Sequence, residues 1–191
     1  MRDIVIRDLC KSYDGAPVLD RFSAVLKAGT VTGLMAPSGG GKTTLLRILM
    51  GLEAPDGGSI EGLEGLRLSA VFQEDRLCEG LDAASNIRLV TPGLSRQEAE
   101  EALRAVGLGE CGGKKVREFS GGMRRRVAIL RAMLARYDLL LLDEPFKGLD
   151  ESTKALVMAD TRRRWAGKTV LLVTHDPAEL EAVGAQACLR L

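Results

Sequence analysis

The chain has 191 residues, 46% hydrophobic and 28% charged, which is enough apolar material for one buried core or for one core with an inserted lobe. Its formal net charge of +1 provides no broad basic surface, so nucleic acid is not expected as a partner. The four cysteines include no C-x-x-C pair, so we expect reduced thiols, mostly in the core, and neither a zinc site nor a disulfide framework.

Short runs of leucine or β-branched residues alternate with longer helical patterns along the chain, which is typical of parallel strands joined by crossover helices. Parallel strands are expected at residues 30–35, 70–72, 139–142 and 169–173, and a smaller antiparallel sheet at residues 4–9 and 24–26. Helices are expected at residues 42–50, 96–106, 122–136, 152–164 and 177–183. The sequence therefore predicts an α/β fold with a mostly parallel sheet and a small antiparallel part.

Helical patterns dominate from about residue 75 to residue 136, which predicts an α-helical lobe inserted into the α/β core. Clusters of glycine and proline at residues 54–58, 91–94 and 107–113 indicate loops. Residues 124–126 are three consecutive arginines on an expected helix, which could form a phosphate or RNA patch. We favour a solvated or partner-facing helix side, because the charge is balanced elsewhere.

The segment APSGGGKTT, residues 36–44, follows an expected strand and opens an expected helix, as a phosphate-binding loop requires. Its glycines would let successive backbone N–H groups turn inward around an anion, and the helix N-terminus adds the positive end of its dipole. The residues expected to bind the phosphates are Ser38, Gly39, Gly40, Gly41, Lys42, Thr43 and Thr44. A glycine-rich turn with a surface lysine is the alternative, and the flanking strand and helix argue against it.

The side chains of this loop suggest separate roles in holding ATP and Mg²⁺. Lys42 would neutralise the β- and γ-phosphates, Thr43 would place its hydroxyl on Mg²⁺, and Thr44 would lie near the α-phosphate. Ala36 replaces the glycine that usually begins the pattern, and its small side chain should do little damage.

A second site is predicted from LLLLDEP, residues 139–145, where an apolar strand ends in two acidic residues. Ligands of open α/β sheets bind at the carboxyl ends of strands. Asp143 is expected to hold Mg²⁺ through water, and Glu144 to orient the attacking water or accept its proton. Without a phosphate loop in the same chain, a solvated turn would explain these carboxylates equally well.

The segment FSGGM, residues 119–123, lies at the start of an expected long helix. Ser120 and the N–H groups of Gly121 and Gly122 would form a second anion site there, although a simple helix cap has the same pattern. FSGGM is similar to the LSGGQ signature motif of the ABC superfamily of ATPases. The resemblance implies that this segment binds the γ-phosphate of the ATP held by the opposite subunit.

Further elements of the ABC family follow in the expected order along the chain. Tyr13 stands where an aromatic ring stacks on adenine, Gln73 in the Q-loop, residues 147–150 (KGLD) at the D-loop, and His175, the only histidine, in VTHD. Without the other motifs, each of these elements would be interpreted as an ordinary tyrosine, glutamine, loop or histidine with no role in ATP binding. The resemblance assigns catalysis to Glu144, His175, Gln73 and Lys42. It assigns Mg²⁺ to Thr43, Gln73 and Asp143.

The signature and the D-loop also depart from the family pattern. Phe119 replaces leucine and Met123 replaces glutamine in the signature, and Lys147 with Gly148 replaces the common Ser-Ala of the D-loop. The change in the D-loop is expected to affect communication between the two subunits of an ABC dimer.

The strings QEDRLCEGLDAASNI and SGGMRRRVAILRAML resemble importer ATPases, most nearly those of nitrate, sulfonate and taurine uptake. The resemblance implies that two such subunits, most simply a homodimer, sandwich two ATP molecules and hydrolyse them to ADP and phosphate. Closure would drive a transmembrane permease, together with a substrate-binding protein if the system is an importer. Many importer subunits continue into a regulatory domain where this chain stops, so residues 1–191 are expected to form a single minimal cassette.

The sequence also bears on the cellular location of the protein and on three alternative functions. Asp3 and Asp8 interrupt any signal-peptide pattern and no apolar run approaches ~20 residues, so we expect a cytoplasmic protein, peripheral on the inner face of the membrane. An exporter subunit and a soluble ABC ATPase, for example for cluster assembly, remain open. A non-hydrolysing regulator is disfavoured, because it would not need Glu144, Gln73 and His175 together.

Overall fold

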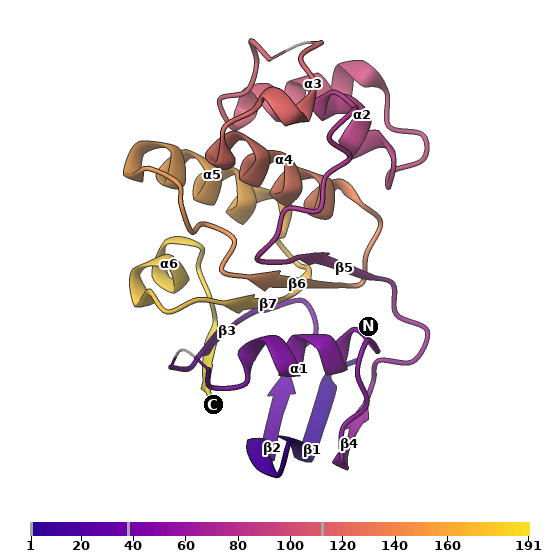
Figure 1. Cartoon of the computed structure of the whole chain (residues 1–191), viewed down its shortest axis with the longest axis vertical. Helices are drawn as coiled ribbons and strands as arrows, with labels where there is room; N and C mark the ends of the chain where they lie inside the picture. The colour runs from indigo at the N-terminus through magenta and orange to yellow at the C-terminus, as the bar shows by residue number, and fades with distance from the viewer. Residues whose placement is uncertain (1, 38, 112) are drawn as a thin grey trace.

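The computed structural model describes residues 2–37, 39–111 and 113–191 (Figure 1). The strands are β1 (Ile4–Tyr13), β2 (Ala16–Leu26), β3 (Val31–Met35), β4 (Gly57–Glu61), β5 (Leu68–Val71), β6 (Leu139–Asp143), β7 (Thr169–Val173) and β8 (Ala187–Arg190). The helices are α1 (Lys42–Leu49), α2 (Ala83–Arg88), α3 (Arg96–Ala105), α4 (Gly121–Leu134), α5 (Glu151–Arg164) and α6 (Pro177–Ala182), with a 3-10 turn η1 (Val116–Glu118).

A parallel sheet forms the centre of the described chain, with the strand order β5-β6-β7-β3-β8. This confirms the expected α/β fold. Val173 of β7 pairs with Leu34 of β3 on one side and with Asp143 of β6 on the other. The segments that follow β3, β6 and β7 therefore leave the sheet at the same edge.

Both faces of this sheet are buried, which explains why its strands are apolar without alternation. Leu140 and Leu172 join the apolar cluster beneath α4 and α5, whereas Leu141 and Leu171 join the cluster that contains α1 and the first two strands. Figure 1 shows α4 and α5 on one side of the sheet and α1 on the other. The functional loops are thus supported by two cores.

A second sheet, with the order β2-β1-β4, is antiparallel throughout and confirms the expected small antiparallel part. Its first two strands are longer than expected because they form a hairpin through Asp14 and Gly15. The φ angles of these residues are 49° and 80°, which suits a type I′ turn.

Helices α2, α3 and α4 lie between β5 and β6 in the chain, and Figure 1 shows α2 and α3 beyond α4 on the side away from the sheet. Each of the three begins with a side-chain cap, provided by Asp82, Ser95 and Ser120 respectively. The lobe bounds of about residues 75–136 and the single cassette of residues 1–191 stay predictions. None of the helices that the structure describes is long and apolar enough to cross a membrane.

Strands β4 and β8 were not expected from the sequence. Strand β4 begins inside the glycine-rich stretch interpreted as a loop, and Gly58 permits its approach to β1 with φ 86°. The four cysteines are free thiols, as expected, but their expected burial is wrong. Cys10 and Cys111 are half-buried, and Cys78 and Cys188 are exposed on the surface.

Candidate functional site

Polar segments follow four neighbouring strands, β3, β5, β6 and β7, and carry the phosphate loop, Gln73, Glu144 and His175 respectively. The carboxyl ends of parallel strands are where open α/β sheets bind ligands. A cavity of about 410 Å³ lies at this edge. It is lined by Tyr13, Val18, Gly39, Gly40, Gly41, Lys42, Thr43, Thr44, Gln73, Glu144 and Lys147.

The phosphate loop has the backbone that an anion cradle needs. Gly39 and Gly41 have φ angles of 78° and 80°, in the region that favours glycine. A Cβ on Gly41 would also lie 2.7 Å from the carbonyl oxygen of Val18. Helix α1 begins with no side-chain cap and has no acidic residue in its first turn, so its N-terminus favours an anion. Ser38 lies outside the described residues.

Lys42 is 8% exposed and folds back over the loop that precedes it. Its amino group donates hydrogen bonds to the carbonyl oxygens of Ala36 at 2.7 Å and Pro37 at 2.8 Å. These bonds hold the cation beside the loop glycines. Thr44 is half-buried and also lines the cavity.

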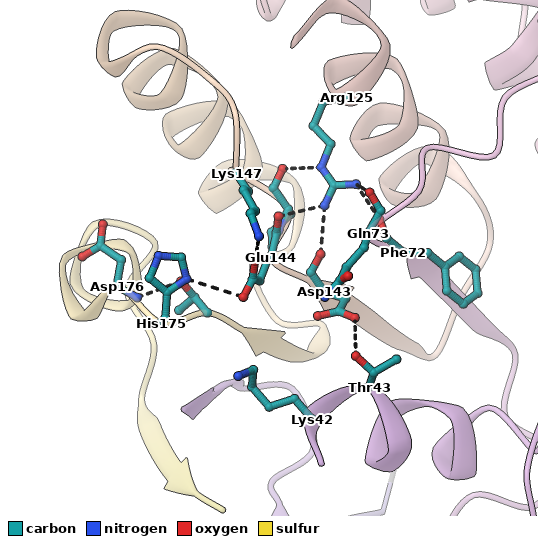
Figure 2. Close-up of polar contacts among 12 residues, drawn as sticks. Lys42, Thr43, Phe72, Gln73, Arg125, Asp143, Glu144, Lys147, His175 and Asp176 are labelled. Atoms are coloured by element: carbon teal, nitrogen blue, oxygen red, sulfur yellow. Dashed lines mark hydrogen bonds and ion pairs between the residues drawn. The ribbon is translucent and has the colours of Figure 1, made fainter. Parts of the chain in front are cut away.

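Thr43 and Asp143 connect the phosphate loop to the end of β6. The Thr43 hydroxyl donates to Asp143 Oδ2 at 3.2 Å, and Asp143 is only 3% exposed (Figure 2). Burial raises the pKa of Asp143 above its usual value, and the hydrogen bond from Thr43 opposes this rise. Asp143 Oδ1 is buried with no hydrogen-bond partner among the described residues.

Glu144 points toward two cationic or protonatable side chains. Its Oε2 lies 2.9 Å from Lys147 Nζ, and its Oε1 lies 3.5 Å from His175 Nδ1 (Figure 2). Burial alone would raise the pKa of Glu144, but Lys147 and His175 together hold that pKa below its usual value. Glu144 also has a φ of 44°, an unusual backbone conformation for a residue with a side chain.

Tyr13 and Gln73 line the same cavity but come from different sheets. Tyr13 ends β1 of the antiparallel sheet, and Gln73 follows β5 of the parallel sheet. Tyr13 is 41% exposed, its hydroxyl donates to Glu53, and the Lys11 amino group lies 5.6 Å from the centroid of its ring. Gln73 is exposed just after β5. Both remain available to a ligand, and their roles stay predictions.

The signature residues begin α4. Ser120 is its cap and accepts a hydrogen bond from the Met123 N–H at 3.3 Å. Gly121 and Gly122 line a neighbouring cavity of about 400 Å³ and are absent from the described lining of the phosphate-loop cavity. Phe119, which departs from the family leucine, is 4% exposed and belongs to the core.

The arginines that follow the signature do not form the solvated or partner-facing helix side that we expected. Arg125 is 5% exposed, and Arg126 donates to the carbonyl oxygens of Val106 at 2.8 Å and Gly107 at 3.2 Å. The expectation is wrong for these two residues because carbonyl groups at the ends of nearby elements satisfy their guanidinium donors. Charge in the sequence gave no signal of this burial.

A lysine that the sequence analysis did not single out supports the histidine loop. Lys154 of α5 lies 3.0 Å from Asp176 and 2.8 Å from Glu179, and its side chain is 14% exposed. The Thr174 hydroxyl donates to Glu179 at 2.5 Å. This cluster ties α6 and the residues that flank His175 to the helix after the D-loop.

Comparison with known proteins identifies a family and several relatives of this chain. Residues 19–147 match the family described as ABC transporter. The chain is 40% identical over 188 residues to an aliphatic sulfonates import ATP-binding protein of Agrobacterium fabrum, covering 94% of this chain and 72% of that protein. It is 37% identical over 194 residues to a protein of the same description from Yersinia pestis, covering 97% and 72%.

A relative with a different cargo in its name is nearly as similar. A zinc import ATP-binding protein of Vibrio cholerae is 36% identical over 176 residues, covering 91% of this chain and 67% of that protein. These matches confirm the resemblance to importer ATPases. The chain therefore belongs to the ABC transporter family, as an ATP-binding subunit that hydrolyses ATP and works with a membrane permease.

Proposed function

We propose that this subunit powers the import of a solute by forming a dimer, most simply with a second copy of itself, at the cytoplasmic face of a membrane. The observation that carries the proposal is the arrangement at one sheet edge, where Lys42, Glu144 and His175 follow β3, β6 and β7. A partner permease would use the closure of the dimer, and a substrate-binding protein would deliver the solute. Nucleic acid has no part in this cycle.

The proposed chemistry is hydrolysis of the γ-phosphate by a water molecule that Glu144 orients. The low pKa of Glu144 keeps it a carboxylate near neutral pH, so it can accept a proton from that water. Lys42 and the N–H groups at the start of α1 would neutralise the β- and γ-phosphates. His175 would steady the γ-phosphate, Gln73 would help to place the water, and Tyr13 would stack on the adenine.

The residues where the end of β6 meets the start of α1 fit a bound Mg²⁺. Asp143 and Thr43 place oxygen donors together, and Mg²⁺ prefers oxygen ligands. The buried Asp143 Oδ1 has no hydrogen-bond partner among the described residues, and a hydrated cation would satisfy it. Asp143, Thr43 and Gln73 are proposed to hold the ion, which would screen the phosphate charge.

The second subunit is proposed because the two anion sites lie in different cavities. Gly121 and Gly122 line a cavity of about 400 Å³ beside the phosphate-loop cavity, so an opposing chain would bring its own Ser120 to this ATP. Import is favoured because the relatives described above are named as import subunits. Sulfonate and zinc occur in those names at similar identity, so the ATP-binding subunit does not identify the cargo.

The decisive experiment is Glu144→Gln. Glutamine keeps the size of the side chain but cannot accept the proton, so turnover should fall by on the order of 10²–10⁴. ATP binding should survive, and the closed dimer should persist with ATP, because a ligand that binds only the closed form stabilises it. Gel filtration with Mg²⁺ and ATP, run beside a phosphate-release assay, measures both effects.

Two results would contradict the proposal in different ways. Wild-type hydrolysis by Glu144→Gln would show that this carboxylate is not the base. An inactive variant that binds ATP yet remains monomeric would exclude the two-subunit sandwich.

A further inference from the structure

Arg125 is a buried cation outside the residues assigned to catalysis. It lies about one and a half turns into α4, the helix that Ser120 caps, and its side chain is 7% exposed. Figure 2 shows its guanidinium between the segment that carries Gln73 and the turn that carries Glu144. Its hydrogen bonds go almost entirely to backbone carbonyl groups of these two segments.

On one side, the guanidinium binds three successive carbonyl oxygens at the end of β6. Nη2 donates to the carbonyls of Asp143 and Glu144, both at 2.8 Å, and Nε donates to that of Pro145 at 2.9 Å. Successive carbonyls of an extended strand point in opposite directions. They converge here because the chain leaves β6 through Glu144, whose φ is 44°.

The conformation of Glu144 is strained and persists only where neighbouring groups fix it. Its N–H donates to the Val173 carbonyl of β7 at 2.9 Å, and its own carbonyl accepts from Arg125. Peptide groups on both sides of the strained φ are therefore fixed. The Glu144 carboxylate projects toward the cavity from this fixed backbone.

On the other side, Nη1 binds the loop after β5. It donates to the carbonyl oxygen of Phe72, to that of Gln73 at 3.3 Å, and to Asp75 Oδ1 at 3.2 Å. Burial of a cation is costly unless it is paired and hydrogen-bonded, and the Asp75 carboxylate supplies the countercharge. The planar fork of arginine reaches both segments at once, which a lysine ammonium cannot do.

We propose that Arg125 is a positioning residue for ATP hydrolysis, which holds the Gln73 loop and the Glu144 turn in one fixed arrangement and links both to the signature helix. The inference rests on the roles proposed above for Glu144 and Gln73. Since Arg125 and Ser120 share one helix, a phosphate bound at Ser120 acts on the same rigid body that holds the catalytic turn of its own chain.

The test compares Arg125→Lys with Arg131→Lys in the intact chain. Arg131 is a matched control because it lies on the same helix and binds the same loop, donating to the carbonyls of Arg76 at 2.8 Å and Asp75 at 3.0 Å. Among the described residues, Arg131 donates no hydrogen bond to Gln73 or to the turn after β6. Phosphate release is measured against ATP concentration, and thermal melting reports the stability of each variant.

For Arg125→Lys we expect kcat to fall roughly 10- to 100-fold, because small displacements of catalytic groups have effects of this size. The KM for ATP should change less than about threefold, since the phosphate loop is untouched. Arg131→Lys should lower the melting temperature while kcat stays nearly unchanged. Equal losses of kcat in the two variants, or a rise in KM with unchanged kcat for Arg125→Lys, would overturn the inference.

Asp75→Asn gives a second test that leaves the arginine in place. Loss of the countercharge should lower kcat about threefold with KM unchanged, a ratio typical of one weakened hydrogen bond. An unchanged kcat contradicts the inference. Glu144→Gln in the same assay separates the catalytic role of Glu144 from the positioning role of Arg125. An inactive Glu144→Gln together with a fully active Arg125→Lys would contradict only the role of Arg125.

Discussion

The N-termini of α1 and α4 are both glycine-rich, yet they differ in how complete they are as anion sites. At α1 the backbone cap is Gly41, no side chain caps the helix, and Lys42 lies over the loop. At α4 the side chain of Ser120 already caps the first turn, and the first turn has no lysine. The first site combines N–H groups with a buried lysine, whereas the second combines N–H groups with the hydroxyl of Ser120.

This difference indicates a division of labour between two similar helix ends. The α1 site carries the charge needed to bind a triphosphate by itself. Two of the three arginines beside the α4 site do not supply such charge, because Arg125 is directed to the backbone of the catalytic turn and Arg126 to the end of α3. We therefore expect the α4 site to bind phosphate only when another subunit presents it.

Loss of Lys42 should have the largest effect on nucleotide binding. Charge-assisted hydrogen bonds contribute about 1.5–3 kcal/mol each, so Lys42→Ala should weaken ATP binding by about 100-fold. Lys147→Ala is the matched comparison, because Lys147 lines the same cavity but its side chain is 68% exposed. Titration of both folded variants with ATP tests this. Equal affinities would show that the cation beside the loop is not what completes the α1 site.

A charge placed at the α4 site should affect turnover and leave nucleotide binding by a single chain intact. A Cβ on Gly121 would meet nothing within 4 Å, so Gly121→Ala and Gly121→Glu should both fold. The glutamate would repel the phosphate of the opposing subunit and lower turnover roughly 10- to 100-fold, because like charges brought together across an interface are unfavourable. Gly121→Ala should lose much less. A Gly121→Glu variant that binds ATP weakly as a monomer would contradict the division of labour.

The sequence alone predicted those parts of the structure that depend on local chemistry. The runs of leucine and β-branched residues predicted β6 and β7 almost to the residue, because strands buried on both faces must be apolar. Strand β4 was missed because Gly58 suggests a loop, and only pairing with β1 explains it. The burial of Arg125 could not be predicted, since it depends on carbonyl groups from two distant segments.

Lys147 provides a test of how the D-loop departure affects the base. In Lys147→Ser, Glu144 loses a cation 2.9 Å away, so its pKa should rise toward the usual range. A base with a higher pKa is protonated at higher pH, so the acidic limb of the kcat/KM profile should move to higher pH. The rate at neutral pH should change less than about threefold, because exposed ion pairs are weak. A pH–rate profile identical to that of the wild type would show that this contact does not influence the base.

The capping box of α3 should contribute to the stability of the fold and not to ATP turnover. In this it differs from the N-termini of α1 and α4, which are expected to bind phosphate. The Ser95 hydroxyl accepts from the Glu98 N–H at 3.1 Å, and Glu98 accepts from the Ser95 N–H at 2.8 Å. Ser95→Ala should lower the free energy of unfolding by about 1 kcal/mol, whereas Ser95→Thr should largely retain it. ATP turnover per folded molecule should be the same in both.

The pH dependence of the stability lost in Glu98→Ala distinguishes a capping box from a cap made by the serine hydroxyl alone. The hydrogen bonds with Ser95 hold the pKa of Glu98 below its ordinary value of 4.5. A carboxyl group with a lowered pKa stabilises the fold above its ordinary pKa, and the contribution disappears as pH falls through the lowered value. The stability gap between wild type and Glu98→Ala, which removes this carboxylate and keeps the serine hydroxyl, should therefore be full at neutral pH and narrow in acid, as denaturant unfolding at several pH values would measure. A gap that stays constant into strong acid would show that only the serine hydroxyl caps α3, and that the Glu98 carboxylate has no part in it.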